Sequence, residues 1–234
     1  MPLFSLEIFH VLTLLYSFLT MTKNVKKIEE KPIKVILLGE SGVGKTSIIL
    51  RYSKDKFETI AASTIGATFI EKDLIRNNIK YTLNIWDTTG QEKYHSVTKL
   101  FIQGADIVIL VYSIDKNITF KALDYWYQTV RDMCGDNIIL AIIGNKYDLF
   151  DKEEIQDEKV EDEVGESYAK EKNAIFKLVT AKLDRKGIDS LFDELLNEYI
   201  KKHCEENIGK NDNSNNNKLE IKKEKKNEKK NRFC

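Results

Sequence analysis

Short apolar runs recur along the central part of the chain, and the segments between them have apolar residues at helical spacing. The runs are nearly continuous and rich in β-branched residues, which is typical of strands buried on both faces of a sheet. These runs are Lys34–Gly39, Tyr81–Asp87, Asp106–Tyr112, Asn137–Asn145 and Ala174–Thr180.

The segments between the runs predict helices, and one further β-rich segment predicts a hairpin. Apolar residues in the last helical segment recur at i, i+3, i+4 and i+7, which gives a helix one core-facing stripe. Asn77-Asn78 lies between β-rich residues 67–76 and the run that follows, so it predicts a tight turn between two strands. The predicted helices are Thr46–Lys54, Thr119–Met133, Val160–Lys172 and Ile188–Lys202.

This alternation of strands and helices predicts an α/β fold in three layers. We expect a six-stranded, mostly parallel sheet with one antiparallel strand and with helices on both faces. The domain is expected to span residues 33–203, with an N-terminal hydrophobic extension at 1–32 and a tail at 204–234.

The apolar segment Met1–Thr22 allows three interpretations. Glu7 and His10 interrupt it and no basic stretch precedes it, so it is a poor signal peptide. Either the start codon is assigned too early and translation begins at Met21, or the segment is a hydrophobic anchor or docking helix, or it is a packed extension. The sequence leaves these alternatives open.

The tail differs in composition from the domain. Residues 209–217 read GKNDNSNNN, which cannot bury a core, and we expect them to be disordered. Lys218–Cys234 contains eight Lys or Arg and three Glu, so its net charge is +5. A solvated charged segment is one interpretation. A lipid on the terminal Cys234 beside this basic segment would instead make a two-part membrane anchor.

Charge and cysteine usage narrow the class of protein. The whole chain has 37 basic and 37 acidic residues, and no extended basic surface with interleaved aromatics is evident, so nucleic-acid binding is not expected. Cys134, Cys204 and Cys234 are widely spaced, which fits neither a disulfide framework nor a metal site. A cytosol-facing protein fits best.

A phosphate-binding motif follows the first strand and opens the first helix. Residues 39–46 read GESGVGKT and match G-x-x-x-x-G-K-[ST] in the strand–loop–helix context that the motif requires. The glycines let backbone N–H groups surround an anion at the helix N-terminus. Lys45 would reach the β- and γ-phosphates of a nucleoside triphosphate, and the Thr46 hydroxyl would bind Mg²⁺. The fold is therefore expected to be that of a P-loop NTPase.

Two later motifs predict the base. Residues 145–148 read NKYD directly after a strand. The carboxylate of Asp148 can accept hydrogen bonds from the N1–H and the exocyclic amino group of guanine, whereas adenine offers no such pair. Thr180-Ala181-Lys182 follows the last strand, where a backbone N–H could meet the guanine O6.

With these motifs in this order, the chain from Lys34 to Lys202 resembles the Ras superfamily and, within it, the Rab family. Residues 86–92 read WDTTGQE and look like the family's WDTAGQE. Residues 63–69 read STIGATF and look like the first switch and the Rab-type segment after it. The TIGA sequence and Tyr94-His95-Ser96 are most similar to the early-endosomal Rab branch.

The resemblance implies roles for single residues. Thr64 would ligate Mg²⁺ and donate its N–H to the γ-phosphate, and Asp87 would hold Mg²⁺ through water. The Gly90 N–H would contact the γ-phosphate, Gln91 would orient the attacking water, and Phe57 would stack on guanine. The expected catalytic residues are Gln91, Lys45 and Gly90, the metal ligands are Thr46, Thr64 and Asp87, and the nucleotide contacts are Ser41, Gly42, Val43, Gly44, Lys45, Thr46, Ser47, Phe57, Thr64, Gly90, Asn145, Lys146, Asp148, Thr180, Ala181 and Lys182.

Three aromatic residues and two departures from the family pattern complete the comparison. Phe69, Trp86 and Phe101 match the triad through which Rabs present a nucleotide-dependent surface, although ordinary half-buried core is an equal interpretation. Thr89 stands where the family has Ala, and a hydroxyl there could slow hydrolysis. The chain ends in the single Cys234 instead of paired cysteines.

The resemblance implies a GTP-binding switch of vesicle trafficking, on the endocytic route, on the cytosolic face of endomembranes. Its partners would be an exchange factor, a GTPase-activating protein, a GDP-dissociation inhibitor and effectors, together with a membrane reached by prenylation of Cys234. Two alternatives stay open: a hydrolysis-impaired, GTP-bound scaffold, and an ATP-using P-loop enzyme.

Overall fold

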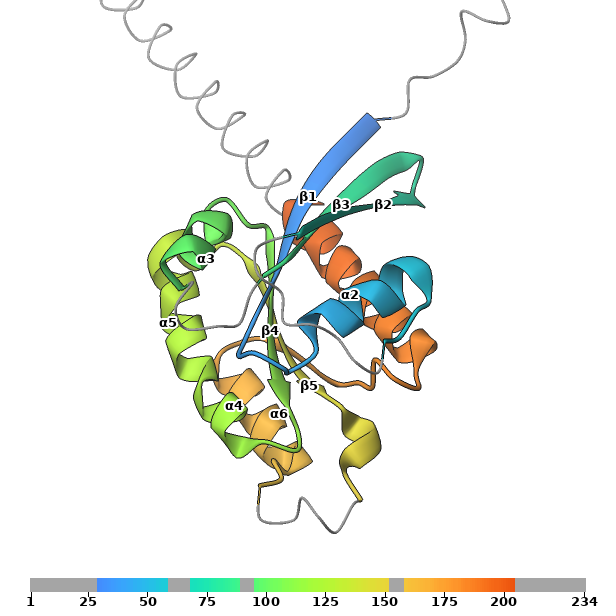
Figure 1. Ribbon diagram of the computed structural model, residues 1–234. Helices are drawn as coiled ribbons and strands as arrows, with labels where there is room; N and C mark the ends of the chain where they lie inside the picture. Colours follow the sequence, from blue (N-terminus) through green and yellow to red (C-terminus); the bar gives the residue numbers. More distant parts are fainter. Residues whose placement is uncertain (1–28, 59–67, 89–94, 152–157, 205–234) are drawn as a thin grey trace, which may run out of the picture. The chain divides into compact units, whose positions relative to one another are not determined.

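The computed structural model describes residues 29–58, 68–88, 95–151 and 158–204. Its described strands form one sheet in the order β2-β3-β1-β4-β5-β6 (Figure 1). They span Glu29–Leu38 (β1), Thr68–Arg76 (β2), Ile79–Asp87 (β3), Ile107–Ser113 (β4), Ile139–Asn145 (β5) and Ile175–Leu178 (β6). β4 pairs in parallel with β1 and β5, and β5 with β6, whereas the β2–β3 hairpin is antiparallel. The predicted sheet is confirmed.

Helices alternate with these strands. They are α2 (Lys45–Lys54), α3 (His95–Ile102), α4 (Asn117–Lys121), α5 (Leu123–Cys134), α6 (Asp162–Glu171), the 3₁₀-helix η2 (Tyr147–Leu149) and a C-terminal helix over residues 185–204. The segment predicted as one helix from Thr119 is divided at Ala122, although the Ala122 N–H still bonds the Ile118 carbonyl at 3.1 Å. Helix α3 has no counterpart among the predicted helices.

The start of α6 differs from its prediction by two residues, for a reason visible in the structure. The sequence pattern predicts a helix from Val160, but the Val160 N–H donates to the carbonyl of Ile114, directly after β4 (3.0 Å), and the side chain is buried. Glu161 then has extended backbone angles as the N-cap, and the helix begins at Asp162. The tertiary contact at Val160 thus delays the helix.

Helices cover both faces of the parallel strands. Figure 1 shows α2 and the C-terminal helix on one side of β4 and β5, and α3, α5, α4 and α6 on the other. On the first side, the rings of Tyr52 and Phe192 stack with centroids 3.8 Å apart. On the other side, Trp126 and Val130 of α5 are buried against a cluster that includes Leu110 and Tyr112. Every residue of β4 is buried, as its continuous apolar run predicts.

The chain divides into two compact units, Met1–Pro32 with Asp73–Thr82, and the remainder. Within the first unit, Asn77 and Asn78 both have positive φ (52° and 60°), as a two-residue hairpin turn requires, so the predicted turn is confirmed. Lys80 makes an ion pair of 3.1 Å with Asp73, which also accepts a 2.8 Å hydrogen bond from Thr82.

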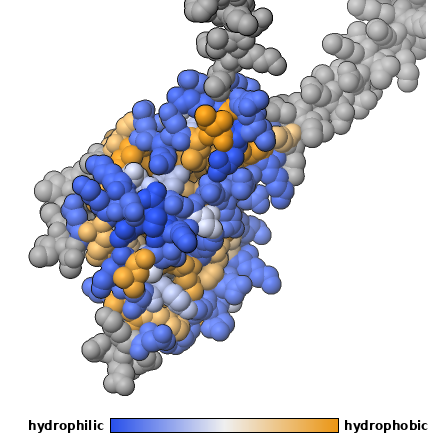
Figure 2. Space-filling view, turned by 90° about the vertical axis from the view of Figure 1, so that its right-hand side faces the viewer, coloured by the Kyte–Doolittle hydropathy of each residue, from blue (hydrophilic) through white to orange (hydrophobic). Residues whose placement is uncertain are grey.

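The surface of the described residues is mixed in polarity. On the face that Figure 2 shows, hydrophilic residues predominate and hydrophobic ones form small separate patches. Among the described residues, no helix combines the length and the apolar character needed to cross a membrane.

Candidate functional site

The phosphate-binding loop packs so closely that two of its positions admit only glycine. Gly39 has φ of 141°, and a Cβ there would lie 2.1 Å from the Val111 carbonyl oxygen of β4. Gly44 has φ of 97°, and its Cβ would lie 2.3 Å from Asn145 Nδ2. A side chain at either position would meet a steric clash as well as an unfavourable left-handed backbone. The loop is therefore fixed against the ends of β4 and β5.

Lys45, the first residue of α2, is 5% exposed and points back over the loop. Its Nζ donates to the carbonyls of Gly39 (2.7 Å) and Glu40 (3.0 Å). Burial lowers the pKa of Lys45 to about 8, although the charges of Asp87 and Glu40 oppose the shift. An ammonium group held this way gains stability when an anion enters the loop.

Thr46 and Asp87 bring the loop and the end of β3 together. The Thr46 hydroxyl donates to Asp87 Oδ2 at 2.7 Å, and Asp87 is 2% exposed. Burial raises the pKa of Asp87, while the bond from Thr46 and the charge of Lys45 lower it. Its other oxygen, Oδ1, is buried and has no hydrogen-bond partner among the described residues. A hydroxyl and a carboxylate with a spare oxygen fit a hard cation such as Mg²⁺.

Asn145, at the end of β5, joins the phosphate loop to the segment after β6. Its side-chain amide donates to the Val43 carbonyl at 2.8 Å, and its Oδ1 accepts from the Ala181 N–H at 3.2 Å. Asn145 is 2% exposed, so both bonds are shielded from water. The residue that the sequence placed in a base-recognition motif thus also connects two loops.

Asp148 lies on η2 and faces the segment after β6. Its Oδ1 accepts from the Thr180 hydroxyl at 2.6 Å, and Lys182 Nζ lies 3.9 Å from Oδ2. Lys146, directly before η2, has φ of 67° and places its Nζ 3.6 Å from Asp115 Oδ1. The two motifs predicted to bind the base are therefore adjacent in space.

Sequence reasoning missed two residues that support this arrangement. Arg51 of α2 donates from Nε to the Ala181 carbonyl (2.8 Å) and from a terminal nitrogen to the Lys182 carbonyl (2.9 Å). Thr88 donates to the Leu37 carbonyl at 2.6 Å and so joins the end of β3 to β1. No local pattern marks Arg51, because its partners lie about 130 positions away.

The remaining predicted residues are placed as follows. Ser41 and Gly42 lie exposed on the loop, Ser47 is half-buried on α2, and Phe57 is half-buried in the segment after α2. The predictions for Thr64, Gly90, Gln91 and Cys234, and the departure at Thr89, lie outside the described residues.

The three aromatic residues of the predicted triad contact one another in a row. The centroids of Phe69 and Trp86 are 5.2 Å apart, and those of Trp86 and Phe101 are 5.3 Å apart. Phe69 is 45% exposed, whereas Trp86 and Phe101 are half-buried. Phe69 therefore presents an aromatic surface to solvent, while Trp86 and Phe101 also pack against the core cluster.

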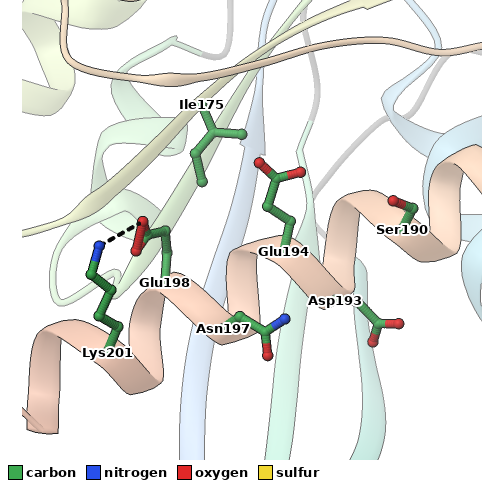
Figure 3. A pocket seen from close by; sticks show the side chains of 7 residues that line it. All are labelled: Ile175, Ser190, Asp193, Glu194, Asn197, Glu198 and Lys201. Atoms are coloured by element: carbon green, nitrogen blue, oxygen red, sulfur yellow. Dashed lines mark ion pairs between the residues drawn. The ribbon is translucent and has the colours of Figure 1, made fainter.

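A separate groove of about 430 Å³ lies between β6 and the C-terminal helix, and none of the predicted site residues lines it (Figure 3). Among its acidic side chains, Glu194 and Glu198 have basic partners within the chain. Lys177 Nζ lies 2.7 Å from Glu194, and Lys201 Nζ lies 3.6 Å from Glu198. Because these charges are compensated, we assign the groove no role.

Comparison with known proteins identifies the family to which this nucleotide site belongs. The model of the Ras family matches residues 34–201, which contain the phosphate loop, Asp87 and both base motifs. The chain belongs to the Ras family of small GTPases. Like the other members, this GTPase hydrolyses GTP, so the alternative of an ATP-using enzyme is excluded.

Relatives of this GTPase agree with the resemblance to the Rab branch. It is 37% identical over 161 residues to the Ras-related protein RABF2a of Arabidopsis thaliana, covering 69% of this chain and 78% of the relative. It is 38% identical over 164 residues to the human Ras-related protein Rab-22A (70% and 81%). It is 39% identical over 175 residues to the putative ras-related protein Rab-5B of Dictyostelium discoideum (75% and 78%). The predicted family is confirmed.

Proposed function

We propose that this GTPase is a Rab-type switch of vesicle trafficking on the endocytic route. The observation that carries the proposal is the row formed by Phe69, Trp86 and Phe101, which offers an exposed aromatic edge next to the end of β3. Aromatic side chains are enriched where proteins recognise partners. The similarity to relatives named Rab-22A and Rab-5B supports the same assignment.

The nucleotide would be held from both ends of the site. Lys45 and the backbone N–H groups of residues 41–47 would bind the phosphates, and Asp148 would accept from the N1–H and amino group of guanine. A backbone N–H of the segment Thr180–Lys182 would face the guanine O6, and Phe57 would pack against the ring. Asn145 supports this arrangement because it bonds the phosphate loop and Ala181 together.

Hydrolysis would depend on positioning and on charge stabilisation. Thr46 and Asp87 would hold Mg²⁺ with Thr64, and the ion would neutralise charge on the phosphate oxygens. Lys45 would stabilise the same charge, and Gln91 would orient the attacking water. No arginine in the part of the chain that the structure describes is placed to act in cis, so we expect intrinsic turnover on the order of 10⁻⁴ s⁻¹, raised ~10⁵-fold by an activating protein.

The switch itself would be the contact of Thr64 and Gly90 with the γ-phosphate. Both residues would hold their loops only while that phosphate is present, and its loss would release them. Effectors would bind the aromatic row in the GTP state, and an exchange factor would restore that state. Because hydrolysis is irreversible, the protein would pass through the GTP and GDP states in one order.

Membrane attachment would come from the tail. One prenyl chain on Cys234 together with the net charge of +5 over Lys218–Cys234 would provide two signals, where a single lipid gives only marginal binding. A GDP-dissociation inhibitor would extract the lipidated GDP form. The protein would then cycle between the cytosol and the cytosolic face of endosomal membranes.

Localisation of tagged full-length protein tests the proposal. A Gln91→Leu variant, locked in the GTP state, should concentrate on endosomes, and adding Cys234→Ser should return it to the cytosol. Mass spectrometry of the native protein should find Cys234 prenylated. Endosomal enrichment that is unchanged by Cys234→Ser would reject the anchor, and no enrichment on any endosome would reject the endocytic assignment.

The hydroxyl at Thr89 favours a second candidate, a GTP-bound scaffold with impaired hydrolysis. A phosphate-release assay with and without a GTPase-activating protein separates the two. A switch is stimulated by orders of magnitude, whereas the scaffold would release phosphate equally slowly in both reactions.

A further inference from the structure

The turn that carries Asp148 is short and needs support from its surroundings. It consists of η2, which is three residues long, and begins after Lys146 in a left-handed conformation. A non-glycine residue in that region is strained and persists only where the surrounding structure holds it. The contacts that hold this turn therefore determine where the Asp148 carboxylate lies.

Tyr147, directly before Asp148, is held from two sides. Its backbone N–H donates to the Val179 carbonyl at 3.1 Å, which ties the turn to the segment after β6. Its hydroxyl donates to Asp162 Oδ2 at 2.8 Å, which ties the turn to the first residue of α6. A hydrogen bond to a carboxylate is stronger than one between neutral groups. Asp162 is thus a second anchor for the guanine motif.

The second oxygen of Asp162 belongs to the same buried region as a tyrosine hydroxyl of β4. Oδ1 is buried and has no hydrogen-bond partner among the described residues, and the same holds for the hydroxyl of Tyr112, whose side chain is fully buried. Burial first, and the charge of Asp162 second, raise the pKa of Tyr112, so these groups share one environment. Asp162 therefore binds Tyr147 and shares the environment of the buried Tyr112 hydroxyl.

Tyr112 also connects α6 to the strand before the motif. A Cβ on Gly144 would lie 2.7 Å from the Tyr112 hydroxyl oxygen, and a Cβ on Gly165 of α6 would lie 2.5 Å from it. Tyr112 therefore fills the space between the residue preceding Asn145 and the second turn of α6. Tyr112 thus links α6 to the residue before the guanine motif, and Tyr147 links α6 to the motif itself.

We propose that Asp162 is a positioning residue for guanine recognition, acting through the Tyr147 hydroxyl on the turn that carries Asp148. The inference rests on the proposed role of Asp148 as the guanine reader. Guanine presents two donors to that carboxylate and hypoxanthine only one. A displaced carboxylate therefore weakens GDP binding more than IDP binding, and the GDP:IDP affinity ratio reports its position.

The test compares dissociation constants of GDP and IDP for the full chain with Mg²⁺. Tyr147→Phe removes the hydroxyl and keeps the ring, and Asp162→Ala removes the acceptor. In each variant the affinity for GDP relative to IDP should fall about fivefold, the scale of one lost hydrogen bond. Asp162→Asn, which keeps an acceptor oxygen, should restore most of the ratio. The thermal unfolding temperature of each variant is measured alongside, to check that it is folded.

Tyr168→Phe is the matched control. Tyr168 lies on the same helix and donates to Asp124 at 2.8 Å, so it also loses a tyrosine–carboxylate bond, but away from the motif. Its ratio should equal that of the wild type. A similar fall in Tyr168→Phe would show general loosening of α6 and overturn the inference.

Asp148→Ala distinguishes a failure of the proposed guanine contact from a failure of the positioning role of Asp162. If it abolishes the preference for GDP while Tyr147→Phe and Asp162→Ala keep the wild-type ratio, Asp162 has no positioning role and only the present inference fails. If Asp148→Ala itself keeps the wild-type ratio, the proposed guanine contact is wrong.

Discussion

The hydroxyl of Thr46 donates a 2.7 Å hydrogen bond to Oδ2 of Asp87. This bond joins the first turn of α2 to the last residue of β3, while Oδ1 of the same carboxylate stays buried without a partner among the described residues. Two hard oxygen ligands are thereby held together on different elements, which is the arrangement that a magnesium nucleotide needs.

Replacing Thr46 tests this cation site. Thr46→Val keeps the shape and removes the hydroxyl, so Mg²⁺ should no longer slow GDP dissociation, whereas Thr46→Ser should retain the effect. The effect is measured as the rate of GDP dissociation with a chelator divided by the rate with Mg²⁺. In Thr46→Val we expect this ratio to fall at least about tenfold, the equivalent of 1.4 kcal/mol. Equal slowing by Mg²⁺ in Thr46→Val would place the ion elsewhere.

Gly44→Ala should abolish nucleotide binding. The new methyl group would meet Asn145 Nδ2 at 2.3 Å, at a φ of 97°. Gly104→Ala is the control, because Gly104 also has positive φ (72°) but has no atom within 4 Å of the new Cβ. That control should lose only about 1 kcal/mol of stability from backbone strain and bind GDP normally. Comparable GDP affinity of both variants would contradict the role of close packing.

Nucleotide binding should take up a proton above pH 8. The pKa of Lys45 is about 8 in the free protein, and phosphate charge nearby raises it, so a deprotonated Lys45 must gain a proton when GDP enters. We expect a clear uptake of protons at pH 8.5 and much less at pH 7. Affinity should consequently fall as the pH rises through this range.

Calorimetry in buffers of different ionisation enthalpy measures the uptake. Lys45→Arg supplies the background, since a guanidinium stays charged throughout and any remaining uptake belongs to the nucleotide. The same uptake at pH 7 and pH 8.5, or in both proteins, would show that Lys45 does not change its protonation.

Thr89→Ala should hydrolyse GTP faster than the wild type. A hydroxyl beside the γ-phosphate would disturb the water that Gln91 orients, and alanine removes it. Single-turnover hydrolysis without an activating protein is the direct measurement, and GDP affinity serves as a check that the site is intact. Identical rates would remove the hypothesis.

Sequence reasoning succeeded where local chemistry determines structure. Continuous apolar runs predicted β4 and β5 to within two residues, and Asn77-Asn78 predicted the hairpin because asparagine tolerates positive φ. The sequence predicted no strand order; in the structure this order brings the phosphate loop beside Asp87 and Asn145, because motifs at the carboxyl ends of parallel strands meet at one edge of a sheet.

Contacts between distant segments escaped prediction. The bonds from Arg51 to the segment after β6, and from Tyr147 to Asp162, depend on how whole helices pack, which no short window of sequence encodes. The delayed start of α6 has the same origin, because Val160 is held by Ile114. Propensity thus locates an element, and tertiary bonding sets its end.

Asn145 makes two bonds, one to the loop that would hold the phosphates and one to the segment that would hold the base. Displacing either of these two segments would disturb the other, because both are bonded to the same side chain. Release of the nucleotide should therefore be cooperative. An exchange factor that displaces only the phosphate loop should also loosen the segment that would hold the base.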